Sequence, residues 1–373
     1  MNPTTVLRHH AARWALGPLV ALMVAGTSLA AAPSPAAEAP PSRTWQRQAV
    51  PYYTPSQWVD AVWHFHQRPR AKQFALDAQT LAVLLERTCA RPPANDTPAQ
   101  RREAWSRTLD SWSALSAVAI GPTLERRSVR HIDFQPARPA MIGQVLASPP
   151  TRLDELDRIG APARGLPALE WWLWSPDAPQ DAAACQYATL LARQVAHEAL
   201  ALLQGVQARI PDGGSDDEPA DAAPAFGEIV NQWVGAIEGL RWRELGKPQA
   251  SARLNQPPRF SRQLSGQSAR VWMAQWAAIR DLAVQTNGPA PQAGEGPIPL
   301  ETYLRGRGLN GPAQALSQAV RDADHHLKGL SEPAPAKRVR AAVRSLEQLK
   351  RVAEAQVAPA LQVSLGFSDA DGD

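Results

Sequence analysis

The chain has 373 residues. The roughly 340 that follow residues 1–32 are enough for two domains or one large helical bundle. Its formal net charge is only +4, and no block of Lys and Arg with interleaved aromatic residues occurs, so the sequence argues against a nucleic-acid partner. After the N-terminal segment no stretch is apolar enough to span a bilayer, so we expect no transmembrane segment in the mature chain.

Residues 1–32 have the three parts of a secretory signal peptide. Arg8 and Arg13 supply a positive start, residues 14–29 are uncharged and mostly apolar, and residues 30–32 are small, as signal peptidase requires. A transmembrane anchor is the alternative, but the uncharged run falls short of the roughly 20 residues that span a bilayer. No Cys stands at the cleavage site, so lipid anchoring is not expected. We therefore predict a periplasmic protein whose signal peptide is cleaved.

The sequence contains two cysteines, Cys89 and Cys185. In an oxidising compartment an even pair predicts one disulfide. Such a bond would close a loop of nearly a hundred residues and contribute roughly 4–5 kcal/mol in the chain-entropy description. Two buried free thiols are the alternative.

Helix signals begin after residues 33–51, which are rich in Pro and Ala and which we interpret as a linker. The sequence Thr-Pro-Ser-Gln at residues 54–57 predicts a helix start with an N-cap, a Pro in the first turn and a Gln that closes a capping box. Residues 97–100, Thr-Pro-Ala-Gln, repeat this pattern.

Apolar residues then recur at spacings of three and four, which place them on one face of a helix. No run of alternating β-branched residues competes with this pattern, so the predicted fold class is all-α. One stripe comprises Leu191, Val195, Ala199, Leu202 and Val206, and another comprises Val339, Val343, Leu346, Leu349, Ala353 and Val357. Further stripes contain Trp105 and Trp112, then Trp233, Ile237 and Leu240, then Trp272, Trp276 and Ile279.

Residues 211–224, PDGGSDDEPADAAP, combine Pro, Gly and a local acidic run. This composition is typical of a solvated loop. We interpret it as the boundary between two helical bundles, residues 52–210 and residues 225–373.

Few residues match a known catalytic pattern: the chain has no Gly-rich phosphate loop, HExxH zinc pair or Gly-x-Ser-x-Gly elbow. Asp322 and His326 would share a helical face beside His325 and could supply two metal ligands, although a surface His pair is the commoner explanation. The acidic ending, residues 369–373, starts like a calcium loop but stops before the later ligands, so we interpret it as a frayed tail.

A series of landmarks occurs in a fixed order along the chain: Trp105 through Trp112 leading to Gly121-Pro122, GLPALEWWLW at 165–174, Cys185-Gln186-Tyr187, Glu238 through Gly246-Lys247-Pro248, then Ser261, Ser265 and Ser268, and the ending LGFSDADGD. In these landmarks the chain resembles the imelysin family of exported peptidases and iron-uptake-associated proteins. The resemblance implies two packed helical bundles with a pocket between them.

The hallmark of that family is Gly-x-His-x-x-Glu. Gly165 and Glu170 occupy its Gly and Glu positions here, but Pro167 stands at the His position. A His and a Glu three residues apart on a helix can bind one cation, whereas Pro offers neither a lone pair nor a backbone N–H. A metal that activates water needs about three protein ligands and an open position, which Glu170 alone does not supply.

Glu170 lies among apolar residues, and a buried carboxylate requires a partner. Arg164, Arg241 and Arg243 are the candidates. We predict a polar binding pocket, with Glu170 as a possible metal ligand; a buried ion pair that only ties the two halves together is the alternative. The predicted pocket residues are Arg164, Gly165, Glu170, Trp172 and Arg241.

The resemblance leads to three hypotheses about function. The first is a non-catalytic periplasmic binding protein, linked to the acquisition of iron or another metal and able to bind a metal ion or a small ligand. The second is a metallopeptidase. The third is an interaction scaffold, in which exposed Trp171, Trp172 or Trp174 would bind an envelope protein.

Overall fold

The structure, a computed structural model, describes residues 50–90, 98–210, 219–253, 256–286 and 288–366. Every regular element in these ranges is helical, and none of them contains a β-strand. Four predictions lie wholly or mostly outside the described residues: the signal peptide, the linker, the first part of the acidic loop and the acidic tail.

The helices are labelled α, and the shorter π or 3₁₀ turns are labelled η. Up to the acidic loop they are α1 (Pro55–Ala61), η1 (Val62–Gln67), α2 (Arg68–Ala90), α3 (Pro98–Ser116), α4 (Pro122–Glu125), α5 (Ser128–Ile132), α6 (Pro139–Leu146), η2 (Leu153–Arg158), η3 (Ala161–Ala163), α7 (Gly165–Trp174) and α8 (Ala182–Gln207). After it come α9 (Ala222–Glu238), η4 (Gly239–Gly246), α10 (Lys247–Ala250), α11 (Ser268–Ala283), α12 (Leu300–Gly306), α13 (Asn310–Leu327), α14 (Ala336–Val352), η5 (Ala353–Val357) and α15 (Ala358–Ala360).

The first helix begins as the sequence predicts. The Thr54 hydroxyl accepts a hydrogen bond from the Gln57 amide at 3.3 Å, and the Gln57 side chain accepts one from the Thr54 amide at 3.0 Å. This reciprocal cap satisfies backbone donors that have no partner inside the helix. From there α1, η1 and α2 continue one another up to Ala90, with a wider π turn at η1.

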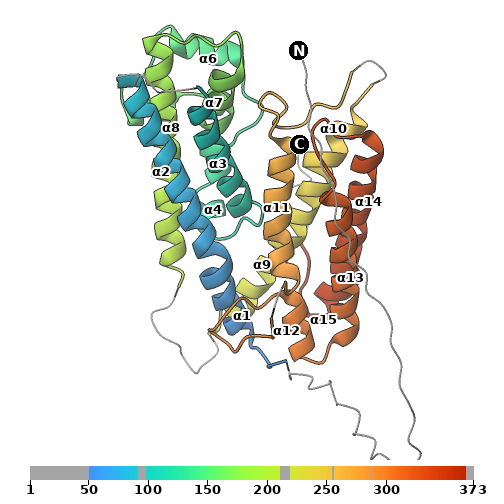
Figure 1. Cartoon of the computed structure of the whole chain (residues 1–373). Helices are drawn as coiled ribbons and strands as arrows, with labels where there is room; N and C mark the ends of the chain where they lie inside the picture. The colour runs from blue at the N-terminus through green and yellow to red at the C-terminus, as the bar shows by residue number, and fades with distance from the viewer. Residues whose placement is uncertain (1–49, 91–97, 211–218, 254–255, 287, 367–373) are drawn as a thin grey trace, which may run out of the picture. The chain divides into compact units, whose positions relative to one another are not determined.

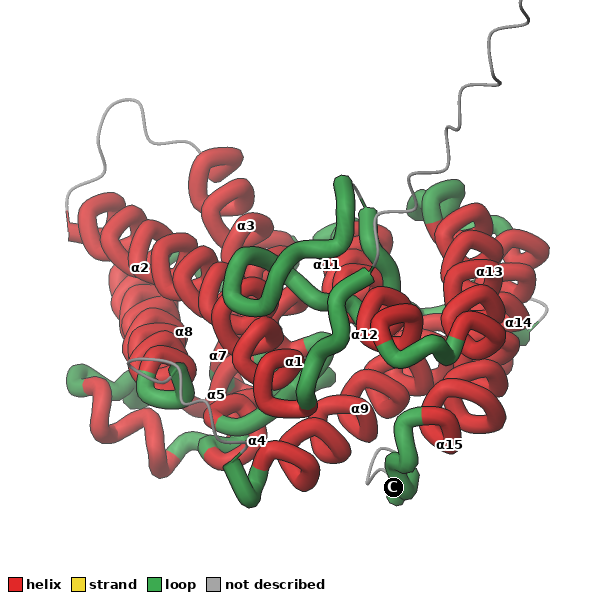
Figure 2. Tube along the Cα trace, turned by 90° about the horizontal axis from the view of Figure 1, so that it is seen from below, coloured by secondary structure: helices red, strands yellow, loops and turns green. Residues whose placement is uncertain are grey.

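The helices form two packed bundles, as predicted (Figure 1). In the first bundle α2 packs against α3 and α8, and α7 packs against both α3 and α8. In the second, α14 packs against α9 and α13, and α11 packs against α9 and α13. The bundles meet where α11 lies against α3 and η1 and where α1 lies against α9, and Figure 2 also shows α1 beside α9. Residues 48–373 accordingly form one compact unit.

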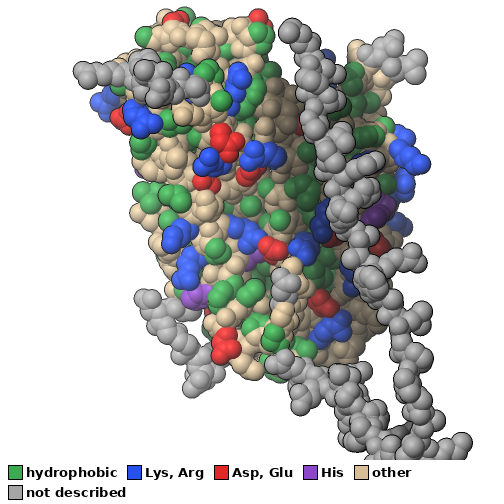
Figure 3. Space-filling view, viewed as in Figure 1, with side chains coloured by type: hydrophobic (Ala, Val, Ile, Leu, Met, Phe, Trp, Pro, Cys, Tyr) green, Lys and Arg blue, Asp and Glu red, His purple; other side chains and the backbone are tan. Residues whose placement is uncertain are grey.

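The predicted apolar stripes form the core. All five stripe residues of α8 are buried, and so are Trp105, Trp112, Trp233, Trp272 and Trp276. On the face seen in Figure 3, acidic and basic side chains are interspersed over both bundles. None of the described helices is both long and apolar enough to cross a membrane.

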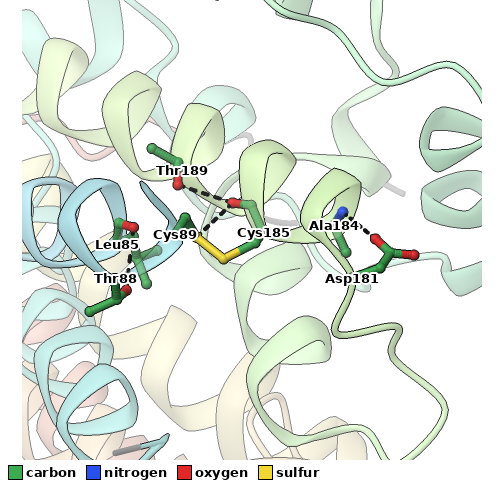
Figure 4. The surroundings of a disulfide bond; sticks show 7 residues. All are labelled: Leu85, Thr88, Cys89, Asp181, Ala184, Cys185 and Thr189. Atoms are coloured by element: carbon green, nitrogen blue, oxygen red, sulfur yellow. Dashed lines mark hydrogen bonds between the residues drawn. A yellow bond between two sulfur atoms is a disulfide. The ribbon is translucent and has the colours of Figure 1, made fainter. Parts of the chain in front are cut away.

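The predicted disulfide is confirmed (Figure 4). Cys89 lies at the end of α2 and Cys185 at the start of α8, with their Cα atoms 5.6 Å apart, inside the usual range for a disulfide. Asp181 caps α8 just before this point, accepting a 2.8 Å hydrogen bond from the Ala184 amide. The bond therefore fastens the end of α2 to the first turn of α8.

The disulfide closes a loop of 96 residues in sequence separation, which predicts a large stabilisation. We expect the double variant Cys89→Ala/Cys185→Ala to lose up to about 4–5 kcal/mol of unfolding free energy, because its unfolded chain regains loop entropy. Urea unfolding followed by circular dichroism measures this loss. Reduced wild-type protein should match the double variant, and equal stability of oxidised and reduced protein would contradict the prediction.

Candidate functional site

The site predicted around Glu170 is built on the start of α7. Gly165, the first residue of this helix, has a φ of +69°, which glycine adopts without strain. A Cβ at this position would lie 2.3 Å from the carbonyl oxygen of Ile132. Only glycine therefore lets α7 approach the end of α5 so closely, and this approach brings α7 next to Asp133, the residue that follows α5.

Pro167 lies in the first turn of α7 and is buried. The amides of a first turn have no partner inside the helix, so the missing N–H of proline costs little there. The position one turn before Glu170 is thus filled by an apolar ring that can bind no cation.

Glu170 is 5% exposed, and both of its carboxylate oxygens accept hydrogen bonds. Oε2 accepts from a guanidinium nitrogen of Arg262 at 3.0 Å. Oε1 accepts from the Ser265 hydroxyl at 2.6 Å and from the Ser265 amide at 3.1 Å. The segment that leads into α11 therefore satisfies the carboxylate of α7.

Arg262 lies between two carboxylates and is 1% exposed. Its second terminal nitrogen donates to Asp133, and its guanidinium lies 5.6 Å from the centre of the Trp105 ring. Burial by itself lowers the pKa of Arg262, but the charges of Asp133 and Glu170 and their hydrogen bonds outweigh it, so the pKa is raised. The guanidinium is charged at every pH at which the protein folds.

This arrangement has the chemistry of an internal ion cluster. Two carboxylates and one guanidinium leave a formal charge of −1, and the guanidinium occupies the space between the acids. A catalytic metal would need open coordination and about three protein ligands. Within the described ranges, no three or more His, Cys, Asp or Glu side chains gather in a way that could hold a metal ion.

The predicted partners of Glu170 are wrong. Arg164 is buried, but it donates to the Leu156 carbonyl at 3.0 Å and lies 3.6 Å from Asp157. Arg241 instead forms a bidentate pair with Glu238, at 2.6 and 2.7 Å. Both arginines have nearer acceptors on their own stretch of chain, so neither reaches Glu170.

The prediction that Arg243 pairs with Glu170 is also wrong. Its guanidinium lies 3.5 Å from the carboxylate of Glu244 instead.

The tryptophans of α7 are not an exposed patch, contrary to the scaffold hypothesis. Trp172 is buried, lines an apolar void of only about 10 Å³, and its indole N–H has no hydrogen-bond partner among the described residues. Trp174 packs edge-on against Trp105, with ring centres 4.8 Å apart. Trp171 is partly buried against the core. These side chains join α7 to its neighbouring helices.

Sequence reasoning missed two members of the cluster, Asp133 and Arg262. Arg262 lies between Ser261 and Ser265, two residues of the serine landmark. Its place within that landmark could have marked it as a site residue. Asp133 carries no such signal, since it simply follows a short helix.

Comparison with known proteins places the chain. The family model described as Imelysin matches residues 67–364, which is more than half of the chain. The chain belongs to the imelysin family. The match includes the whole Glu170 cluster and both bundles. A search of the curated proteins found no match.

Two solved structures share the imelysin fold with this chain. An imelysin-like protein from Psychrobacter arcticum is 17% identical, with a TM-score of 0.67, over 84% of this chain and 97% of that one. A putative iron-regulated protein A precursor from Parabacteroides distasonis is 12% identical, with a TM-score of 0.65, over 83% of this chain and 96% of that one. At these identities the likeness establishes the fold.

Removing Arg262 should be costly because it leaves two buried carboxylates without their cation. We expect Arg262→Met to lose about 3–5 kcal/mol of unfolding free energy, measured by urea unfolding. The same change in an Asp133→Asn/Glu170→Gln background should cost far less, because no buried acid is then left unpaired.

Arg107→Met, at a side chain that is 62% exposed and whose partner Glu103 is also exposed, is the matched control and should change stability by less than about 0.5 kcal/mol. Equal costs of Arg262→Met in the two backgrounds would contradict the ion-cluster interpretation.

Proposed function

We propose that this chain is an exported, non-catalytic member of the imelysin family, and that it works in the periplasm as a binding component of iron or other metal acquisition. The observation that carries the proposal is the Arg262 guanidinium, which takes the place of a cation between Glu170 and Asp133. Pro167 stands where the family hallmark has His, and it removes the neighbouring ligand.

The same geometry disfavours metal-dependent peptide hydrolysis. Activation of water needs a metal with an open position, held by about three protein ligands. Here both oxygens of Glu170 are engaged by Arg262 and Ser265, and Pro167 offers no lone pair. A guanidinium cannot replace the metal in this reaction, because it has no site at which a water could be deprotonated.

Export and the link to iron rest on other observations. The N-terminal segment has the pattern of a cleaved signal peptide, and the Cys89–Cys185 disulfide is suited to an oxidising compartment. One structural neighbour is titled a putative iron-regulated protein A precursor. These observations support an envelope protein whose role belongs with metal uptake.

The non-catalytic part of the proposal predicts that purified protein leaves an unfolded substrate such as denatured casein intact. Added zinc or iron should make no difference, and Glu170→Gln, which keeps the shape of the side chain, should likewise show no cleavage, because Glu170 holds no metal. Mass spectrometry of the digest detects any cleavage. Cleavage by the wild type that disappears both with a chelator and in Glu170→Gln protein shown by circular dichroism to be folded would instead establish a metallopeptidase.

The link to iron predicts a response in the host cell. We expect the amount of this protein in the periplasmic fraction to rise several-fold when cells grow with an iron chelator, as quantitative mass spectrometry would measure. Cells that receive the chelator together with excess iron are the control. An unchanged amount would remove the link to iron and leave the non-catalytic assignment standing.

A further inference from the structure

A second site lies away from Glu170, where the first long helix meets the end of α11. There a cavity of about 500 Å³ opens between η1, the start of α2, α11 and residues 284–286 and 288–299. This volume is within the 300–1,000 Å³ that is usual for small-molecule sites. Its apolar wall includes Val62, Phe65, Leu282, Val284 and Ile298. It shares no residue with the Glu170 cluster.

The π turn η1 shapes one side of this cavity. A π turn widens the helix and changes the partners of its carbonyl groups, and such turns are often found at functional sites. Here the His66 carbonyl accepts a 2.9 Å hydrogen bond from Arg70. This bond fixes the Arg70 side chain, whose other terminal nitrogen forms a 2.6 Å ion pair with Asp281 of α11.

His66 lines the cavity but is not available as a base or a metal ligand. Its Nε2 lies 2.9 Å from the Ala278 carbonyl, which requires that nitrogen to donate, and its Nδ1 accepts from Gln67 at 3.4 Å. Burial, and then the nearby charge of Arg70, hold the pKa of His66 well below its usual range. His66 is therefore neutral and adds no charge to the cavity.

Besides Arg70, the charged groups of the lining are two carboxylates. Asp281 is 44% exposed, and its second oxygen accepts no hydrogen bond from the described part of the chain. Glu295 also lines the cavity, and its carboxylate forms no ion pair with a described residue. With Arg70 at +1 and the two acids at −2, the formal charge of the lining is −1.

Proline has no N–H, so the opposite wall, which contains four prolines, has fewer backbone donors than other segments of its length. Residues that line this wall include Pro289, Pro291, Pro297 and Pro299. Tyr53 donates to the Pro291 carbonyl at 2.6 Å, which fastens the proline-containing segment to the start of the first helix. The wall is thus held at the start of the first helix, and its four prolines offer no backbone N–H to a ligand.

An acidic, acceptor-rich cavity with an apolar wall matches one class of small molecule. We propose that this cavity binds an organic ammonium compound, with its cationic group at Asp281 and Glu295 and its apolar body against Phe65, Val62 and Ile298. A carboxylate ligand would face two acids and an arginine that already has a partner. A neutral ligand could donate a hydrogen bond to Asp281 but would not balance the negative charge of the lining.

The test uses phenethylamine as the probe on the full-length mature protein, with binding measured by isothermal calorimetry. We expect saturable 1:1 binding. 2-Phenylethanol and phenylacetate have the same ring without the positive charge, and each should bind about tenfold or more weakly. Equal binding of the alcohol, preference for phenylacetate, or no binding of phenethylamine at millimolar concentration would overturn the proposal.

Variants of the cavity test which carboxylates bind the ammonium group of phenethylamine. Asp281→Asn should weaken phenethylamine binding about tenfold or more, because it removes a charge-assisted hydrogen bond. Glu295→Gln, at an exposed side chain, should weaken binding to a smaller extent and serves if Asp281→Asn does not fold. Asp322→Asn, at an exposed aspartate of α13, is the matched control and should change nothing. Unaltered affinity in both cavity variants would refute the site.

Discussion

The buried guanidinium of Arg262 holds the two bundles together at the Glu170 site. Its acceptors, Glu170 and Asp133, belong to the first bundle, whereas Arg262 belongs to the segment that leads into α11 of the second. Three charges removed from water carry a large desolvation cost, which only close geometry with every oxygen satisfied can offset. The hydroxyl and amide of Ser265 complete that requirement at Glu170. The surrounding helices must therefore hold these groups within hydrogen-bonding distance of one another.

Helix α11 holds these groups in place, because ion pairs join it to the first bundle near both of its ends. Arg270 in its first turn pairs with Asp110 of α3, and Asp281 in its last turn pairs with Arg70 of α2. Between them, the Ala278 carbonyl contacts His66. Both ion pairs are partly exposed, so each contributes little to the free energy of unfolding. Their main effect is to fix the position of α11 against the first bundle. The cavity lies beside one of these contacts, the Arg70–Asp281 ion pair.

The sequence predicted local features well because their causes are local. The Thr54–Gln57 cap depends on residues three apart, and the α8 stripe depends on helical spacing, so both can be read without a fold. The partner of Glu170 could not be predicted in this way. Arg262 lies 92 residues from it, and several arginines were equally plausible until packing decided. The π turn η1 also had no visible local signal, because it arises where one helix contacts both bundles.

The kind of cation between Glu170 and Asp133 decides what chemistry the site can perform. A metal ion is exchangeable and can accept water or a substrate atom at an open coordination position. A guanidinium is part of the chain, stays charged at any pH at which the protein folds, and uses its N–H groups to bond the two acids. It satisfies the same carboxylates without offering a reactive position. A site filled in this way joins the two bundles. The cavity at Asp281, with an uncommitted carboxylate oxygen and an apolar wall, is the place where we propose that a ligand binds.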